Sequence, residues 1–277
     1  MVNLSNLKNK KIGILGMGYI GSNILAYLKR FNIKTIEITK KNLSLFKDEK
    51  FDYIINCAGN SGDFRQKLIE TVESNVCLNS YILKNLKIKY CYVYLSSSRV
   101  YGFSDNDNII FDENSFNYYN NLNLDYIYDG SKKLVESLLI NYSKNVDYKI
   151  AILRLSNVYG NFDYLDDSTL IKKITRYKQE SLNNLNVKQN RYSKKDYIHI
   201  NDVVESIVNV IVKIKNSDIF NLTYGKSYSL DDISKILNLN IQSDETVKPA
   251  YSNISSSKIK KEFSLIFKHN FENELKK

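Results

Sequence analysis

Tyr128 and Lys132 are the residues of this sequence whose types and spacing best suit proton transfer. They lie four residues apart, so in a helix both side chains share one face, one turn apart. A neighbouring ammonium stabilises phenolate, and we therefore predict that Lys132 lowers the pKa of Tyr128 from about 10 toward neutral pH. A tyrosine tuned in this way exchanges a proton with a carbonyl or alcohol oxygen. The same pair also suits a solvated helix face, so its meaning depends on the surrounding chain.

A glycine-rich turn near the start of the chain separates a predicted strand from a predicted helix. The apolar run 10–15 precedes the turn, and an amphipathic helical pattern follows it. Glycines at the spacing Gly-x-Gly-x-x-Gly, in this context, let the backbone approach a pyrophosphate at a helix N-terminus. We therefore predict a dinucleotide site with contacts from Gly16, Gly18, Tyr19, Ile20 and Gly21.

The end of the second predicted strand, 35–39, bears on the choice of cofactor. Sites that prefer NAD usually carry an acid there, which binds the ribose 2′-hydroxyl. Thr39 occupies the position, and Lys40 and Lys41 follow it. An uncharged residue before two cations suits the 2′-phosphate of NADP(H), which we predict as the preferred cofactor. NAD(H) is the alternative, with Glu37 as the ribose acid if the strand ends earlier.

Later predicted strands also end in residues that suit a ligand. The strand 51–59 ends in Cys57, Ala58 and Gly59, whose small side chains let a cofactor lie close. The strand 90–95 leads into consecutive hydroxyls, at the strand end where open α/β sheets bind ligands. The expected cofactor contacts on this surface also include Asn75, Leu95 and Ser96.

Composition limits the class of protein. The chain has 277 residues, of which 43% are hydrophobic and 25% are charged, and no apolar run approaches the ~20 residues that span a bilayer. We expect a cytoplasmic protein without a signal peptide or membrane segment. Three cysteines in apolar surroundings indicate buried thiols, and two histidines argue against a metal centre. The lysines behind the net charge of +10 are spread along the chain, which argues against a nucleic-acid partner.

Alternating strands and helices predict an α/β fold, a Rossmann-type doubly wound parallel sheet with a smaller C-terminal substrate-binding lobe. We place the NAD(P)-binding domain at 1–155, with 190–215 returning to it, and the lobe at 156–190 and 216–277. The remaining expectations are a surface loop over 106–123, an apolar side of the Tyr128 helix formed by Leu134, Leu138 and Leu139, a polar helical stretch over 161–190, an extended segment over 196–200, a helix over 203–212, a helix over 229–237 capped by Ser229, and an amphipathic tail from Lys258.

In this order the segments resemble the extended short-chain dehydrogenase/reductase superfamily, the NAD-dependent epimerase/dehydratase family, in its nucleotide-sugar-modifying branch. The resemblance rests on the glycine turn, the Asn-Cys-Ala-Gly strand end at 56–59, and Ser-Ser-Ser-Arg-Val-Tyr-Gly at 96–102. It also rests on the Tyr128 helix with Ser131, Lys132 and Glu136, and on the segments 153–160 and 195–203.

The resemblance implies a role for several side chains. Tyr128 is the acid/base, Lys132 lowers its pKa and holds the nicotinamide ribose, and Ser97 hydrogen-bonds the reacting oxygen. The expected substrate contacts are Ser97, Ser98, Arg99, Asn157 and Lys195. Lys195 stands where many members have an arginine that grips the nucleotide diphosphate in a bidentate contact, which a lysine cannot make. The family also implies a homodimer formed partly through the Tyr128 helix, while Tyr197 and His199 are expected to be packing residues.

Departures from the family pattern narrow the expected activity. Sugar 4,6-dehydratases of this branch carry Asp-Glu where this chain has Ser98-Arg99, so no acid is placed to eliminate water. Fucose-synthase-type enzymes carry a cysteine and a partner histidine, and Arg99 stands in the way of that chemistry too. We therefore expect an NADPH-dependent reductase of a nucleotide-linked 4-keto-deoxy sugar, serving surface polysaccharide synthesis. The alternatives are a 4-epimerase that retains NAD and, in a different class, a non-catalytic NADP-binding sensor.

Overall fold

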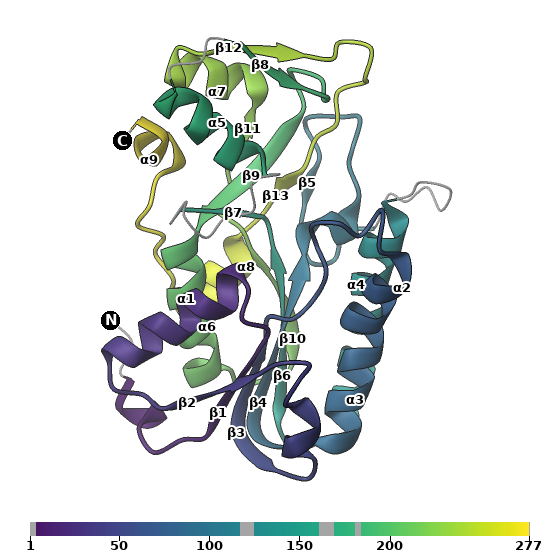
Figure 1. Ribbon diagram of the computed structural model, residues 1–277, viewed down its shortest axis with the longest axis vertical. Coiled ribbons are helices and arrows are strands. Elements are labelled where there is room, and N and C mark those ends of the chain that lie inside the picture. The colour runs from purple at the N-terminus through teal and green to yellow at the C-terminus, as the bar shows by residue number, and fades with distance from the viewer. Residues whose placement is uncertain (1–3, 117–124, 161–168, 181–183, 277) are drawn as a thin grey trace. The chain divides into compact units, whose positions relative to one another are not determined.

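A computed structural model describes residues 4–116, 125–160, 169–180 and 184–276 (Figure 1). The chain divides into two compact units. The first consists of Met1–Val100, Tyr119–Arg154 and Val204–Phe220, and the second of Tyr101–Tyr118, Leu155–Val203 and Asn221–Lys277. The second unit thus includes 101–118, a stretch that the sequence analysis assigned to the cofactor domain.

The first unit is built on a six-stranded sheet in the order β10-β6-β4-β3-β1-β2. The strands are β1 (Ile12–Leu15), β2 (Thr35–Ile38), β3 (Lys50–Asn56), β4 (Lys87–Ser97), β6 (Lys149–Leu155) and β10 (Asp218–Leu222). The pairings of β1 with β2, β1 with β3, and β3 with β4 are parallel. Long buried runs in β3, β4 and β6 fit a sheet covered on both faces. The predicted α/β fold with a parallel Rossmann-type sheet is confirmed.

Helices lie on both faces of this sheet (Figure 1). They are α1 (Tyr19–Arg30), α2 (Leu68–Val72), α3 (Leu78–Asn85), α4 (Tyr126–Tyr142) and α6 (Ile200–Lys213). Helices α1 and α6 cover one face, and α2, α3 and α4 cover the other. A π-helical turn, Glu73–Cys77, joins α2 to α3.

The connection from β2 to β3 contains no α-helix. Residues 39–49 hold one short 3-10 turn, η2 (Leu43–Phe46). The remaining 3-10 turns are Leu4–Leu7, η4 (Ser98–Tyr101) and Ser143–Asn145. The helical segment from α2 to α3 contributes to the wall of the cavity described below.

The second unit contains small sheets and short helices. Its sheets are β11-β9-β7, β12-β8 and β13-β5. The strands are β5 (Ile110–Phe111), β7 (Asn157–Tyr159), β8 (Asn184–Val187), β9 (Lys194–His199), β11 (Ser227–Ser229), β12 (Asn240–Ser243) and β13 (Asn253–Ile254), and the helices are α5 (Leu170–Gln179), α7 (Leu230–Leu237), α8 (Ser257–Phe263) and α9 (Phe271–Lys276). Its core is aromatic, with the rings of Tyr197 and Phe271 stacked at 4.6 Å.

Several local predictions can be judged against these elements. Ser229 caps α7 in a reciprocal capping box with Asp232, which confirms the predicted cap. The prediction of helix throughout 161–190 is wrong at 184–187, because this segment pairs with β12 as a strand and buries Leu185. The predicted loop over 106–123 contains β5. Residues 117–124, 161–168 and 181–183 lie outside the described residues.

Two predictions of burial are corrected. Leu134 is 57% exposed, because the buried face of α4 consists of Tyr128, Lys132, Val135, Glu136 and Leu139. Among the cysteines, Cys91 is buried, Cys57 is partly exposed and Cys77 is exposed. Cys77 ends the π-helical turn, in which Asn75 is the residue that faces the core.

Candidate active site

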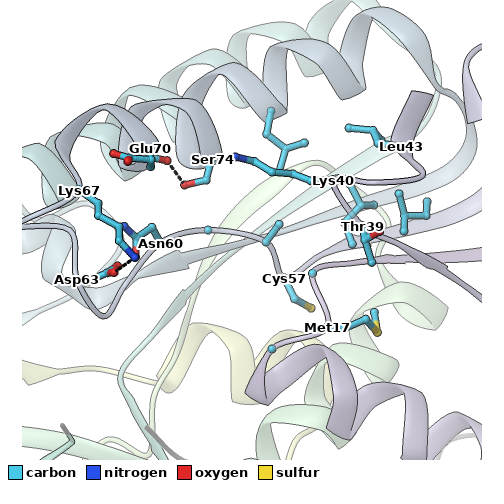
Figure 2. A pocket seen from close by; sticks show the side chains of 17 residues that line it. Met17, Thr39, Lys40, Leu43, Cys57, Asn60, Asp63, Lys67, Glu70 and Ser74 are labelled. Carbon is cyan, nitrogen blue, oxygen red and sulfur yellow. Dashed lines mark hydrogen bonds and ion pairs between the residues drawn. The ribbon is translucent and has the colours of Figure 1, made fainter. Parts of the chain in front are cut away.

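The carboxyl ends of four parallel strands lie in register at one edge of the sheet. Leu15 pairs with Ile38 of β2 and with Asn56 of β3, and Asn56 pairs with Tyr94 of β4. The residues that follow these strands therefore meet at the same edge. A cavity of about 580 Å³ opens there. Its lining includes the predicted contacts Gly16, Gly18, Thr39, Lys40, Cys57, Ala58 and Gly59 (Figure 2).

The glycine turn fits the approach of a pyrophosphate. Gly16 has a φ of +82°, and a Cβ at this position would lie 2.7 Å from the backbone of Ala58, so only glycine fits. No side chain caps the N-terminus of α1 at Gly18. The dipole of this helix end favours an anion. Gly16, Met17 and Gly18, which lead into the helix, line the cavity and suit the diphosphate of a dinucleotide.

Only some of the residues after β2 are placed where they could contact the 2′-phosphate of NADP(H). Strand β2 ends at Ile38, so Thr39 takes the predicted position, and Thr39 and Lys40 line the cavity. Glu37 is exposed and does not line it. The Lys40 side chain is 72% exposed, and its ammonium lies 3.8 Å from the Glu73 carboxylate. Lys41 is not among the lining residues.

One wall of the cavity was not foreseen from the sequence. Asn60, Asp63, Lys67, Glu70, Ser74 and Leu78 form this wall, and Leu15, Met17, Ile38 and Leu43 complete the lining. Figure 2 shows Lys67 paired with Asp63, and the Ser74 hydroxyl donating to the carbonyl of Glu70. The small residues that end β3 were the available signal, because the chain that leaves such a strand end continues along the ligand site.

Other residues that were predicted to contact the cofactor form hydrogen bonds within the protein. Asn75 is fully buried, donates to the Ser131 hydroxyl and accepts from the backbone N–H of Asn60. Ser96 donates to Glu136, and the carbonyl of Leu95 accepts from Lys132. Tyr19, Ile20, Gly21 and these three residues do not line the cavity. Their assignment to the cofactor stays a prediction.

Helix α4 places Tyr128 and Lys132 on one buried face, as their spacing predicts. The Lys132 ammonium lies 6.0 Å from the centre of the Tyr128 ring and donates to the carbonyl of Leu95 at 2.9 Å. Burial lowers the pKa of Lys132 to about 8, although the charge of Glu136 acts in the opposite direction. Lys132 therefore binds its proton less tightly than an exposed lysine does.

Tyr128 does not have the lowered pKa that its spacing from Lys132 suggested. Burial raises the pKa of the phenol, while a hydrogen bond with Ser97 and the charge of Arg99 lower it. For the protein by itself the sequence-based prediction is wrong, because burial outweighs its neighbours. A phenol that keeps its proton is suited to act as a proton donor.

Arg99 is held by two carboxylates of α4. Its Nε donates to Asp129 at 2.8 Å, and one Nη donates to Asp125 at 2.9 Å. Its backbone N–H donates to the Ser97 hydroxyl at 3.2 Å. Ser97 is 8% exposed and Ser98 is 7% exposed. The predicted substrate contact Arg99 thus uses its guanidinium within the protein.

A buried ion pair fastens α4 to the sheet. The Arg154 guanidinium on β6 donates to both oxygens of Glu136, at 2.9 and 2.7 Å, and Ser96 on β4 donates to the same carboxylate at 2.7 Å. All three residues are at most 4% exposed. The helix that carries Tyr128 is therefore tied to two strands beneath it.

Comparison with known proteins identifies the family. The family model "NAD dependent epimerase/dehydratase family" matches residues 12–223. The chain belongs to this family. The predicted resemblance to extended short-chain dehydrogenase/reductases of the nucleotide-sugar branch is confirmed, and an enzyme with a nicotinamide cofactor is supported.

Two curated proteins and one solved structure are similar to the chain. It is 30% identical over 257 residues to a dTDP-D-glucose 4,6-dehydratase of Dictyostelium discoideum, covering 84% of this chain and 57% of that protein. It is 28% identical over 166 residues to an Escherichia coli dTDP-4-dehydro-6-deoxyglucose reductase, covering 58% of this chain and 48% of that protein. The chain thus spans about half the length of these relatives. The structure of RMD from Pseudomonas aeruginosa complexed with NADPH matches with a TM-score of 0.79 at 18% identity, over 96% of this chain and 97% of that one, which shows a shared fold.

In the second unit, the predicted substrate residues of this family member lie around one buried acid. Asn157 donates to the backbone carbonyl of Asp196, and Lys195 donates to Gln189. Asp196 accepts from the Ser156 hydroxyl and from three backbone N–H groups of 224–226. Tyr197 is packed in the aromatic core, and the ring of His199 stacks on that of His269 at 4.0 Å.

The described residues contain neither a metal-ligand cluster nor a helix that could span a membrane. Within the ranges given above, no three His, Cys, Asp or Glu side chains are grouped as metal ligands would be. In the same part of the chain, no helix has the length and apolarity to cross a bilayer.

Proposed function

We propose that this protein is an NADPH-dependent reductase of a nucleotide-linked 4-keto-deoxy sugar. The observation that carries the proposal is the buried Tyr128 phenol, which lies on the same face of α4 as Lys132, one helical turn away. This arrangement holds a proton where an alkoxide would form. When bound, the reduced nicotinamide supplies the hydride.

The protein's own side chains account for the other half of the reduction. Tyr128 donates its proton to the developing alkoxide, and the Ser97 hydroxyl hydrogen-bonds that oxygen. Lys132 stabilises the phenolate left behind, since a cation on the same helix face favours the charged form. The glycine turn and Lys40 would hold the diphosphate and 2′-phosphate of the cofactor.

Several features support reduction rather than loss of water. No carboxylate stands among residues 96–102, Arg99 pairs with Asp125 and Asp129, and Glu136 beside Ser96 is held by Arg154. The Escherichia coli relative carries the name of a 4-keto sugar reductase, and the Dictyostelium relative that of a dehydratase. We therefore assign a dTDP-type keto sugar as the first substrate to test, with Ser98, Asn157 and Lys195 as substrate contacts in a surface polysaccharide pathway.

We also infer a homodimer in the cytoplasm. Helices α2 and α4 contact each other, and their outer faces expose Ile69 (71%) and Leu134 (57%). Exposed apolar side chains on neighbouring helices suit a helix-packed interface with a second copy. Sedimentation of the purified protein would test this assembly.

A 4-epimerase that retains NAD is the second candidate. The observation that favours it is the position of Lys40, which is mostly exposed and lies beside Glu73. A recycled cofactor needs no 2′-phosphate contact. Protein that purifies with bound NAD and interconverts sugar epimers without consuming NADPH would establish this activity.

The test of the proposed reductase is turnover of dTDP-4-dehydro-6-deoxyglucose with NADPH. Tyr128→Phe should bind NADPH like the wild type and lose about 10²- to 10⁴-fold in kcat, because it lacks the proton. Tyr126→Phe, on the same helix but partly exposed, is the matched control and should keep its activity. Full activity of Tyr128→Phe would overturn the assignment of the proton donor.

A further inference from the structure

Four planar side chains, those of Phe64, Arg65, Arg99 and Tyr128, form a cluster at the start of α4. Phe64 stacks on Tyr128 with ring centres 5.0 Å apart and an interplanar angle of 26°. The Arg65 guanidinium lies 4.6 Å from the Phe64 ring centre. The Arg99 guanidinium lies 5.4 Å from the centre of Phe64 and 5.7 Å from that of Tyr128. Arg99 therefore contacts both members of the stack.

Two carboxylates of α4 hold this cluster in place. Asp125 accepts from Arg65 at 2.5 and 2.8 Å and from Arg99 at 2.9 Å. Asp129 accepts from Arg99 at 2.8 and 3.3 Å. The two acids lie on consecutive turns of the helix, and Tyr128 lies between them. Arg99 is thereby fixed in a fork, a geometry that a lysine cannot reproduce.

The cluster joins three separate segments of the chain. Phe64 and Arg65 belong to the loop between β3 and α2, Arg99 follows β4, and both acids begin α4. Phe64 is only 4% exposed although it lies on a loop. Arg99 reaches the loop through the Phe64 ring, while Arg65 of the loop pairs directly with Asp125.

We propose that Arg99 is a positioning residue of the active site, which fixes Phe64 against Tyr128 and so sets the orientation of the phenol toward Ser97. The proposal rests on the proposed function in one respect, namely that Tyr128 is the proton donor. It reassigns Arg99 from substrate binding to the support of Tyr128. Because the backbone N–H of Arg99 also donates to Ser97, one residue orients both groups that face the reacting oxygen.

The first test measures catalysis in Arg99→Gln, with Arg99→Lys and Phe64→Leu beside it. We expect Arg99→Gln to lower kcat by about 10- to 100-fold and to leave KM and the NADPH dissociation constant within about twofold, because orientation is lost rather than binding. Arg99→Lys should restore only part of the kcat that Arg99→Gln loses. The kcat of Phe64→Leu should lie between that of Arg99→Lys and that of the wild type. Arg30→Gln, at the exposed end of α1, is the control.

The second test needs no substrate. Hydrogen exchange of the backbone amides of 60–67 should accelerate by about threefold or more in Arg99→Gln and stay unchanged in Arg30→Gln, because the loop loses the guanidinium that packs on Phe64. A rise in KM with unchanged kcat would show that Arg99 binds substrate instead. Unchanged hydrogen exchange would show that Arg99 does not hold the loop that carries Phe64. If the wild type reduces no keto sugar, the proposed function fails, whereas the exchange experiment still decides whether Arg99 fixes this loop.

Discussion

The Glu136 carboxylate and the Arg154 guanidinium form a bidentate ion pair between α4 and β6 with less than 3% of either side chain exposed. Burying two charges costs desolvation energy, so such a pair adds little stability by itself. Removing one partner deprives the other buried charge of its bidentate counterpart. The pair therefore makes the position of the Tyr128 helix sensitive to a single substitution.

Glu136→Gln should lower the free energy of unfolding by about 3–5 kcal/mol, because it leaves the buried Arg154 without its countercharge. Denaturant unfolding followed by circular dichroism measures this loss. The matched control is Glu180→Gln, whose partner Arg176 is 67% exposed, and it should change stability by no more than about 1 kcal/mol. Equal losses in the two variants would contradict the structural role of the buried pair.

Two neighbouring tyrosines of β4 should respond oppositely to loss of the hydroxyl. Tyr92 donates to Asn79 at 2.6 Å and accepts from Asn56 at 2.9 Å, whereas the buried hydroxyl of Tyr94 has no hydrogen-bond partner in the described part of the chain. Tyr92→Phe should destabilise the protein by about 1–3 kcal/mol, and Tyr94→Phe should be neutral or stabilising. Melting temperatures provide the comparison. A larger loss in Tyr94→Phe would show that its hydroxyl is satisfied.

The depressed pKa of Lys132 makes stability depend on pH in a defined direction. Burial lowers its pKa to about 8 in the folded protein, against about 10.4 in an unfolded chain. Between these values the unfolded chain binds a proton that the folded protein has released, so the unfolding free energy rises with pH. This residue alone should add about 2 kcal/mol between pH 8 and 9.5. The unfolding free energy of Lys132→Met should lack this rise. If the unfolding free energies of the variant and the wild type changed in parallel with pH, the prediction would be refuted.

Cofactor preference should depend on Lys40 but not on Lys41. Calorimetric titration of nucleotide-stripped protein should show tighter binding of NADPH than of NADH, by tenfold or about 1.4 kcal/mol. Lys40→Gln should weaken NADPH binding by about three- to tenfold and leave NADH unaffected, because one partly screened contact to phosphate is lost. Lys41→Gln, the neighbour outside the cavity lining, serves as the control. A preference for NADH in the wild type would favour the NAD-retaining epimerase.

The parts of the site that were predictable from sequence are local in the chain. The glycine turn, Thr39 and the end of β3 each follow a strand within a few residues, and parallel strands bring such ends to one edge. The spacing of Tyr128 and Lys132 likewise needs only a helix. Local pattern therefore sufficed to predict the fold class and part of the lining of the cavity beside the glycine turn.

The features that escaped prediction depend on residues distant in the chain. Arg99 lies 26 and 30 residues from the carboxylates that hold it, and no local signal pairs them. The wall formed by Lys67, Glu70 and Ser74 comes from the start of α2 and from the π-helical turn that follows this helix. The pKa of Tyr128 was misjudged because spacing reveals a neighbour but not the depth of burial.

The division of the chain into two units has a consequence for folding. The first unit takes its strands from three separate stretches, and β10, at the sheet edge beside β6, comes from the last of them. During synthesis the five other strands emerge well before β10 is available, so the edge of β6 stays uncovered while the intervening residues are made. Such long-range pairing slows folding and leaves a strand edge open to aggregation. We expect expression of this protein to benefit from conditions that shield the nascent chain.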